Sequence, residues 1–132
     1  MIPKEKFHGD VGSFITSHDA LARTTRFKKR KEEQGYKPDT FTRAEFFGSN
    51  RINHLLGRKD CVGIRIYYGK RHEDADENPV GEGEGDLKAR MVIVGVRADG
   101  SDIFDDTTGL KDGGDGDALG DGNTCPRHCP TN

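Results

Sequence analysis

The sequence predicts an α+β domain in which N-terminal helices pack on a small antiparallel β-sheet and extended polar arms leave the core. Three observations lead to this prediction. Helical spacing of apolar residues occupies the first third of the chain, and the alternation typical of strands occupies the middle. The remainder is rich in Asp and Gly, with 18 Gly in 132 residues. Because hydrophobic residues make up only 31% and charged residues 33%, the core must be small.

Helices are expected before residue 60. Residues 13–34 have helical spacing, with Ser13 placed to cap the start and Gly35 the end. Thr42 and Glu45 have the spacing of a capping box, so a second helix is expected to start at Thr42. Phe41 and Phe46 have the spacing of a hydrophobic staple at the same start. A short third helix is expected over residues 49–56, where an apolar face lies between a serine and a glycine.

Two strands should form the centre of the sheet. Cys61–Gly69 alternates between apolar and polar residues, and Ala89–Ala98 is apolar almost throughout, as a strand covered on both faces would be. Asp99-Gly100 is a hairpin turn signal, so Ser101–Phe104 is expected to return as a third strand. We expect most of the core to come from Leu55, Leu56, Ile64, Ile66, Val92, Val94, Val96 and Ile103.

Charge is divided by position along the chain. Residues 1–71 hold 16 Lys and Arg against 8 Asp and Glu, whereas residues 72–132 hold 5 against 15, for a total of −2. We therefore expect a basic helical arm (1–41), an α+β core (42–104) and an acidic tail (105–132). Blocks of opposite charge attract one another within one fold or between copies.

Neither a membrane span nor a targeting signal is visible. The N-terminus is charged, and no run approaches the roughly 20 apolar residues that a span needs. Three cysteines, an odd number, argue against a secreted disulfide framework. We expect a cytoplasmic location; export without a cleaved signal would leave no trace in the sequence.

The sharpest local motif is the terminal Cys-Pro-Arg-His-Cys. Cys125 and Cys129 could hold one soft metal ion such as zinc or copper, and His128 or a distant Cys61 or His54 could complete the set. The same pair could form a disulfide or a redox-active pair, or lie unligated in a structural tail. All three interpretations stay open on the sequence.

The string that runs from Thr124 to Pro130 resembles the copper-binding loop of the copper-delivery proteins that serve respiratory oxidase assembly. That loop precedes a helix near the start of a thioredoxin-like domain. Only three residues follow Cys129 here, so this resemblance carries no function across.

Two further charged segments have alternatives. Asp112, Asp115, Asp117 and Asp121 could supply oxygens to calcium, but they do not fit an EF-hand or a repeat pattern, which favours a solvated acidic linker. The basic helix end Lys28–Lys31 could contact phosphates. Glutamates follow it at once, so an acidic segment of the same or a neighbouring chain is the favoured partner over nucleic acid.

Enzymatic patterns are sparse. Cys61 with His54 could act as nucleophile and base, and His72 with Glu73 as an acid/base pair. No third group orients either pair, and no glycine elbow or phosphate loop is present. The sequence therefore favours a protein that is not an enzyme.

A family resemblance rests on residues 49–104 and 124–129. A short helix ending in Leu-Leu, the strand CVGIRIYYG, the segment MVIVGV followed by DGSDI, and a terminal CPxxC are similar to a group of small bacterial proteins of about this length with no assigned function. The resemblance implies one shared architecture, with the terminal cysteines folding back near Cys61. It supplies no catalytic residues.

The function predicted from the sequence is therefore structural. We expect a non-enzymatic interaction protein that self-associates, as a filament or another homo-oligomer, through its basic and acidic segments. The alternatives are a metal-binding protein that uses the terminal cysteines and a thiol redox protein.

Overall fold

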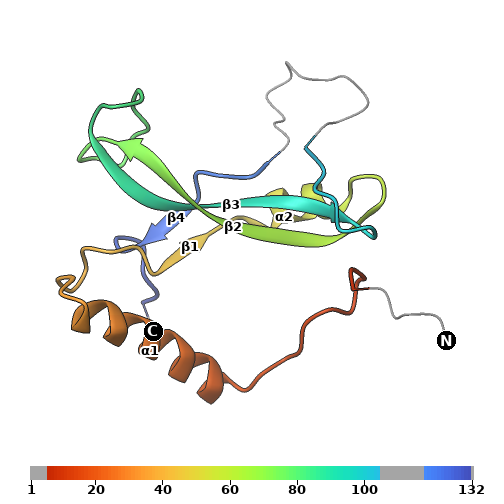
Figure 1. Ribbon diagram of the computed structural model, residues 1–132, viewed down its shortest axis with the longest axis horizontal. Helices are drawn as coiled ribbons and strands as arrows, with labels where there is room; N and C mark the ends of the chain where they lie inside the picture. The colour runs from red at the N-terminus through yellow and green to blue at the C-terminus, as the bar shows by residue number, and fades with distance from the viewer. Residues whose placement is uncertain (1–5, 105–117, 132) are drawn as a thin grey trace. The chain divides into compact units, whose positions relative to one another are not determined.

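The computed structural model describes residues 6–104 and 118–131, which form two helices and four strands (Figure 1). In chain order the elements are α1 (Ser17–Glu33), β1 (Ala44–Phe46), α2 (Ser49–Leu56), β2 (Cys61–Glu73), β3 (Asp86–Arg97) and β4 (Asn123–Cys125). Strand β2 pairs with β3, and β1 pairs antiparallel with β4, in two separate two-stranded sheets. The α+β class with small antiparallel sheets is thus confirmed. Neither helix in this described part of the chain is long and apolar enough to cross a lipid bilayer.

The chain divides into two compact units that interleave along the sequence. The hairpin unit comprises Met1–Val11, Phe47–Lys70 and Arg90–Gly122, and the helix unit comprises the other three segments, Gly12–Phe46, Arg71–Ala89 and Asn123–Asn132. Strands β2 and β3 contribute residues to both units. The division predicted from composition, with limits at residues 41 and 104, stays a prediction.

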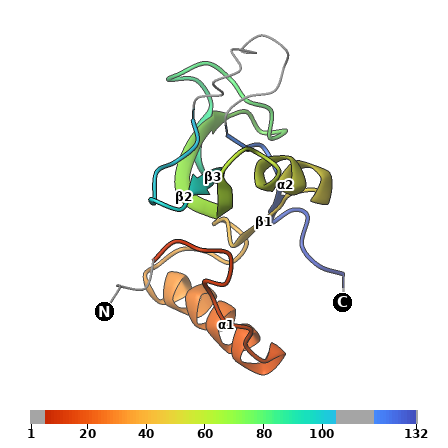
Figure 2. The same ribbon diagram turned by 90° about the vertical axis from the view of Figure 1, so that its right-hand side faces the viewer.

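The core of the hairpin unit is built around β3. Gly95 allows close packing there, since a Cβ atom on it would lie 3.1 Å from Cys61 Sγ and 3.4 Å from the carbonyl oxygen of Leu55. Helix α2 accordingly lies beside the paired strands in both views (Figures 1 and 2). The buried apolar residues of this unit are Leu55, Ile93, Val94, Val96 and Ile103.

The predicted core is wrong at three positions. Leu56, Ile64 and Ile66 are exposed, at 44%, 38% and 51% of their surface. Ile64 and Ile66 lie on the same face of β2 as Tyr68, which is 91% exposed, so this face is open to solvent. Val92 is half-buried, and its unpredicted neighbour Ile93 is buried instead. Alternation along β2 identified its two faces correctly but could not show that the apolar face stays open.

The third predicted strand, Ser101–Phe104, is reduced to one isolated bridge between Val96 and Asp102. The turn before it forms as expected. Gly100 has a φ of +88° and its N–H donates to the carbonyl of Arg97 at 2.9 Å. The N–H of Ile103 donates to the Gly95 carbonyl at 2.9 Å, which fixes the returning segment beside β3.

In the helix unit, α1 begins later than predicted. Thr16, not Ser13, is the N-cap, and its hydroxyl accepts from the N–H of Asp19 at 3.1 Å. The end agrees with the prediction to within a residue. The C-terminal half of α1 is anchored through Phe41, which is 9% exposed and lies 6.5 Å from the Phe27 ring and 6.2 Å from the Tyr36 ring.

The helix predicted to start at Thr42 does not form, and the prediction is wrong. Ala44–Phe46 is strand β1, whose register pairs Ala44 with Cys125 and Phe46 with Asn123. The capping pattern was local, whereas pairing with β4 is a long-range interaction that the local pattern does not contain. Gly48 also leaves too few residues for a stable helical turn to propagate.

Candidate functional site

The terminal motif closes on itself. Cys125 and Cys129 are joined by a disulfide with their Cα atoms 4.6 Å apart. Cys125 is buried at the end of β4, whereas Cys129 is half-buried. Neither sulfur is a thiolate in this bond, and thiolates are what zinc and copper bind. The metal hypothesis therefore concerns the reduced protein, and it stays a prediction.

Arg43 lies against this disulfide. Its Nη2 atom donates to Cys129 Sγ at 3.6 Å and also lies 3.6 Å from the carboxylate of Asp39. The backbone N–H of Arg43 donates to the Cys125 carbonyl at 2.8 Å, as a continuation of the β1–β4 pairing. Its Nε atom is buried and has no hydrogen-bond partner among the described residues. The motif is thus held beside a cation.

His128 and Arg127 point toward the loop between β2 and β3, residues 74–85, which we call the acidic loop. Arg127 Nη2 donates to the Ala75 carbonyl at 2.7 Å, and its Nε lies 3.6 Å from Glu77. His128 Nε2 lies 3.5 Å from the same carboxylate. The predicted ligand His128 therefore faces a glutamate rather than the two sulfurs. The short loop closed by the disulfide ties the acidic loop to the C-terminal segment.

The remaining predicted ligands and catalytic pairs are separate from this motif. Cys61 belongs to the hairpin unit, where its thiol donates to the Gly63 carbonyl at 3.2 Å; its predicted proximity to the terminal cysteines stays a prediction. His54 is exposed on α2, and no hydrogen bond joins it to Cys61 in the part of the chain described. Glu73 is 1% exposed and pairs with Arg71 at 2.8 Å.

No group of three or more His, Cys, Asp and Glu side chains within residues 6–104 and 118–131 is arranged to hold a metal ion. Of the calcium candidates, only Asp121 falls in this range; Asp112, Asp115 and Asp117 lie outside the described residues. A calcium site in that tract therefore stays a prediction.

Helix α1 carries a stripe of arginines. Its sequence holds 6 Lys and Arg against 3 Asp and Glu, and none of its residues is buried. Arg23, Arg26 and Arg30 have the i, i+3, i+7 spacing of one helix face. All three are exposed, and their side chains make no ion pair with any described residue. This arginine stripe is an uncompensated positive surface.

The acidic loop is a negatively charged surface, and its backbone is held by hydrogen bonds within the loop. The Asp74 carboxylate accepts from the N–H groups of Asp76 and Asn78, each at 2.9 Å. These hydrogen bonds, first of all the one from Asn78, lower the pKa of Asp74. The loop holds 5 Asp and Glu and no Lys or Arg. Glu82 and Glu84 are exposed and have no ion-pair partner among the described residues.

Strand β2 and the segment after the Asp99-Gly100 turn meet in a cluster of polar side chains in the hairpin unit. Asp102, in the returning segment, is the centre: Arg65 forms an ion pair with it and Tyr67 donates a hydrogen bond to it. The guanidinium of Arg65 lies over the ring of Phe7, with its Cζ atom 5.5 Å from the ring centroid. Desolvation opposes the charge of Arg65, but hydrogen bonding with Tyr67 and the charge of Asp102 outweigh it and raise the pKa of Arg65. The cluster stabilises the fold and leaves no free acid or base.

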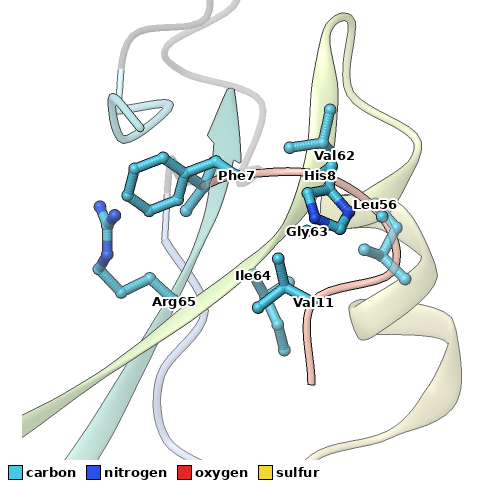
Figure 3. Close-up of a pocket in the computed structure, with 10 residues that line it drawn as sticks. Phe7, His8, Val11, Leu56, Val62, Gly63, Ile64 and Arg65 are labelled. Carbon is cyan, nitrogen blue, oxygen red and sulfur yellow. The ribbon is translucent and has the colours of Figure 1, made fainter. Parts of the chain in front are cut away.

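An open pocket of about 450 Å³ lies beside this cluster (Figure 3). Residues 7–11 pass over the start of β2, and Val11, Leu56 and Ile64 give the pocket an apolar lining. The imidazole of His8 accepts a hydrogen bond at Nδ1 from the Asp10 N–H, at 3.2 Å. The lining of the pocket is mostly apolar, and it includes the polar side chains of His8 and Arg65.

Comparison of the chain with protein-family models, with curated proteins and with solved structures finds no match.

Proposed function

We propose that this chain is a non-enzymatic interaction protein that self-associates, with the arginine stripe of α1 in one copy bound to the acidic loop of the next. The observation that carries the proposal is that α1 keeps Arg23, Arg26 and Arg30 exposed and unpaired although the same chain offers unpaired carboxylates. Attraction that is not satisfied within a fold remains available between copies.

The state of α1 supports an external partner. Most of the stability of a helix in a protein comes from tertiary packing of one face, and α1, with 17 residues, buries none of them. The ring contact between Phe27 and Phe41 lies in its C-terminal half. Leu21 in the first half is 68% exposed. A partner that covers this half would supply the packing that the helix lacks.

The acidic loop is suited to be that partner. The Asp74 hydrogen bonds and Arg127 fix the backbone of its first half, and the N–H of Glu84 donates to the Gly81 carbonyl at 3.0 Å in the second half. Fixed backbone reduces the conformational entropy lost on binding. Arginine presents a planar group that pairs with carboxylates in a bidentate manner. Glu82 and Glu84 could be reached by a helix face that carries arginines at successive turns.

The contact would be heterologous, since the stripe and the loop are different surfaces of one chain. A heterologous contact makes a ring if the rotation closes and a filament if it does not. Both outcomes fit the proposal.

The test is sedimentation velocity of the full chain at about 50 mM and about 1 M salt, because salt screens exposed charges over a few ångströms at the higher concentration. We expect oligomers at low salt that dissociate at high salt. Replacing Arg23, Arg26 and Arg30 with Gln should give monomers at both. The matched control replaces three exposed cations elsewhere, Arg51→Gln, Lys59→Gln and Lys70→Gln, and should still assemble. A wild-type monomer at low salt would overturn the proposal.

A further inference from the structure

The disulfide at the C-terminus has features that a purely structural cross-link does not need. Its two cysteines are separated by only 4 in sequence, and the stabilisation from closing a loop grows with loop length. Its two cysteines are unequally exposed, because Cys125 is 6% exposed whereas Cys129 is half-buried. A guanidinium contacts the sulfur of the more exposed cysteine.

We propose that Cys125–Cys129 is a thiol–disulfide exchange site whose substrate class is a free thiol and in which Arg43 stabilises the thiolate form of Cys129. This activity is independent of the proposed self-association, because it uses neither the arginine stripe nor the carboxylates of Glu82 and Glu84.

The exchange follows from which sulfur can be reached. An incoming thiolate attacks Cys129 Sγ; a bond forms between the two sulfurs, the bond to Cys125 breaks, and Cys125 Sγ leaves with the electron pair and takes a proton from water. A second substrate thiolate then attacks the substrate sulfur of the mixed disulfide and releases Cys129 as a thiolate. Two substrate thiols are oxidised to one disulfide, and the protein disulfide is reduced to two thiols.

Arg43 favours the second step. Its Nη2 atom is already 3.6 Å from Cys129 Sγ, so negative charge that develops on this sulfur meets a cation. The buried Nε–H, which has no acceptor among the described residues, would gain one if the thiolate turned toward it. A cation beside the leaving sulfur stabilises the reduced protein and makes the disulfide more oxidising.

The frame around the site does not depend on the disulfide. The Cys125 carbonyl accepts from the Arg43 N–H at 2.8 Å, and the His128 N–H donates to the Thr124 carbonyl at 2.7 Å. Neither hydrogen bond involves a sulfur atom, so we expect both to persist after reduction and to keep the two cysteines close. Exchange at this site should therefore be reversible.

The experiment uses the full chain in a Cys61→Ser background, equilibrated at pH 8 in buffers of reduced and oxidised glutathione. The fraction of disulfide is read by intact mass after thiol blocking. We compare the native protein, the same protein unfolded in guanidinium, Arg43→Met, Arg43→Lys and an exposed-arginine control, Arg51→Met. Arg43→Lys keeps a cation and controls for the change of side chain. The comparison of native with unfolded protein does not need Arg43→Met, so it tests the proposal even if that variant fails to fold.

An exchange site predicts that the native disulfide is reduced at least as easily as the unfolded one. It also predicts that Arg43→Met needs a glutathione ratio about tenfold more reducing for half-reduction, as expected for loss of a charge-assisted hydrogen bond. Arg43→Lys and Arg51→Met should stay close to the parent. A native disulfide harder to reduce than the unfolded one, or an Arg43→Met protein identical to its parent, would overturn the proposal.

Discussion

The two helices of this chain use their residues in opposite ways. Helix α2 has 8 residues and buries Leu55 to 3% exposure against the β3 strand, whereas α1 has 17 residues and buries none. A short helix held by one leucine is a part of the core. Helix α1 is long and charged and has no buried residue, although Phe27 contacts the ring of Phe41. This difference is why we propose that α2 serves the core and that α1 serves a partner.

The largest test of this comparison replaces one leucine in each helix. Leu55→Ala should lower the free energy of unfolding by about 2–5 kcal/mol, since it removes buried methyl groups and leaves a cavity. Leu21→Ala, at a position 68% exposed in α1, should change it by less than about 0.5 kcal/mol. Urea denaturation followed by circular dichroism measures both. Equal effects would mean that α1 is packed as tightly as α2.

A second comparison concerns charge. Arg65→Met leaves the Asp102 carboxylate, whose side chain is 12% exposed, without its cation, and should lower the urea midpoint clearly. Arg30→Met removes a cation that has no described partner and should leave the midpoint unchanged. The measurement is the urea midpoint of each variant, compared with that of the wild-type protein. If Arg30→Met were the more destabilising change, the arginine stripe would have a structural role instead.

The smallest expected effect is a pH dependence in the hairpin turn. Hydrogen bonds from the Ser101 hydroxyl at 2.6 Å and from its N–H at 2.9 Å lower the pKa of Asp99. A carboxylate whose pKa is lower folded than unfolded adds stability above the unfolded value, about 3.9, and that stability is lost as the pH falls through the folded pKa.

Ser101→Ala keeps the backbone hydrogen bond and loses the hydroxyl, so the Asp99 pKa should rise part of the way toward its ordinary value. Carboxyl-carbon NMR between about pH 2 and pH 5 would follow it. An Asp99 titration that is the same in both proteins would show that the hydroxyl does not contribute.

Much of the fold could be predicted from local patterns. Glycines and alternation placed α2, β2, β3 and the Asp99-Gly100 turn close to where the structure has them. The errors share a cause, which is long-range contact. Strand β1 exists because Asn123–Cys125 pairs with it, and nothing near Thr42 encodes that partner. Likewise, alternation cannot tell whether the face carrying Ile66 is covered.

The same limit applies to the candidate site. The cysteine motif was visible in the sequence, and a disulfide was one of the three states left open for it. Arg43 was not visible, because it contacts Cys129 across a sequence separation of 86 and follows no motif. The ion pair between Arg65 and Asp102 was also missed, although both residues lie in segments that carried the family resemblance. The available signal was Arg65, a charged residue between Ile64 and Ile66 in the predicted strand, which indicated a need for an acidic partner.

The most direct test of the proposed self-association is a charge exchange between two variants. One carries Arg23→Glu, Arg26→Glu and Arg30→Glu, and the other carries Asp76→Lys, Glu82→Lys and Glu84→Lys. A copy with a reversed stripe cannot bind a wild-type loop, so each variant alone should sediment as a monomer at low salt. Mixed together, the reversed stripe and the reversed loop attract, and we expect a complex that about 1 M salt dissolves. Two variants that stay monomeric when mixed, or that assemble equally well alone, would contradict the account.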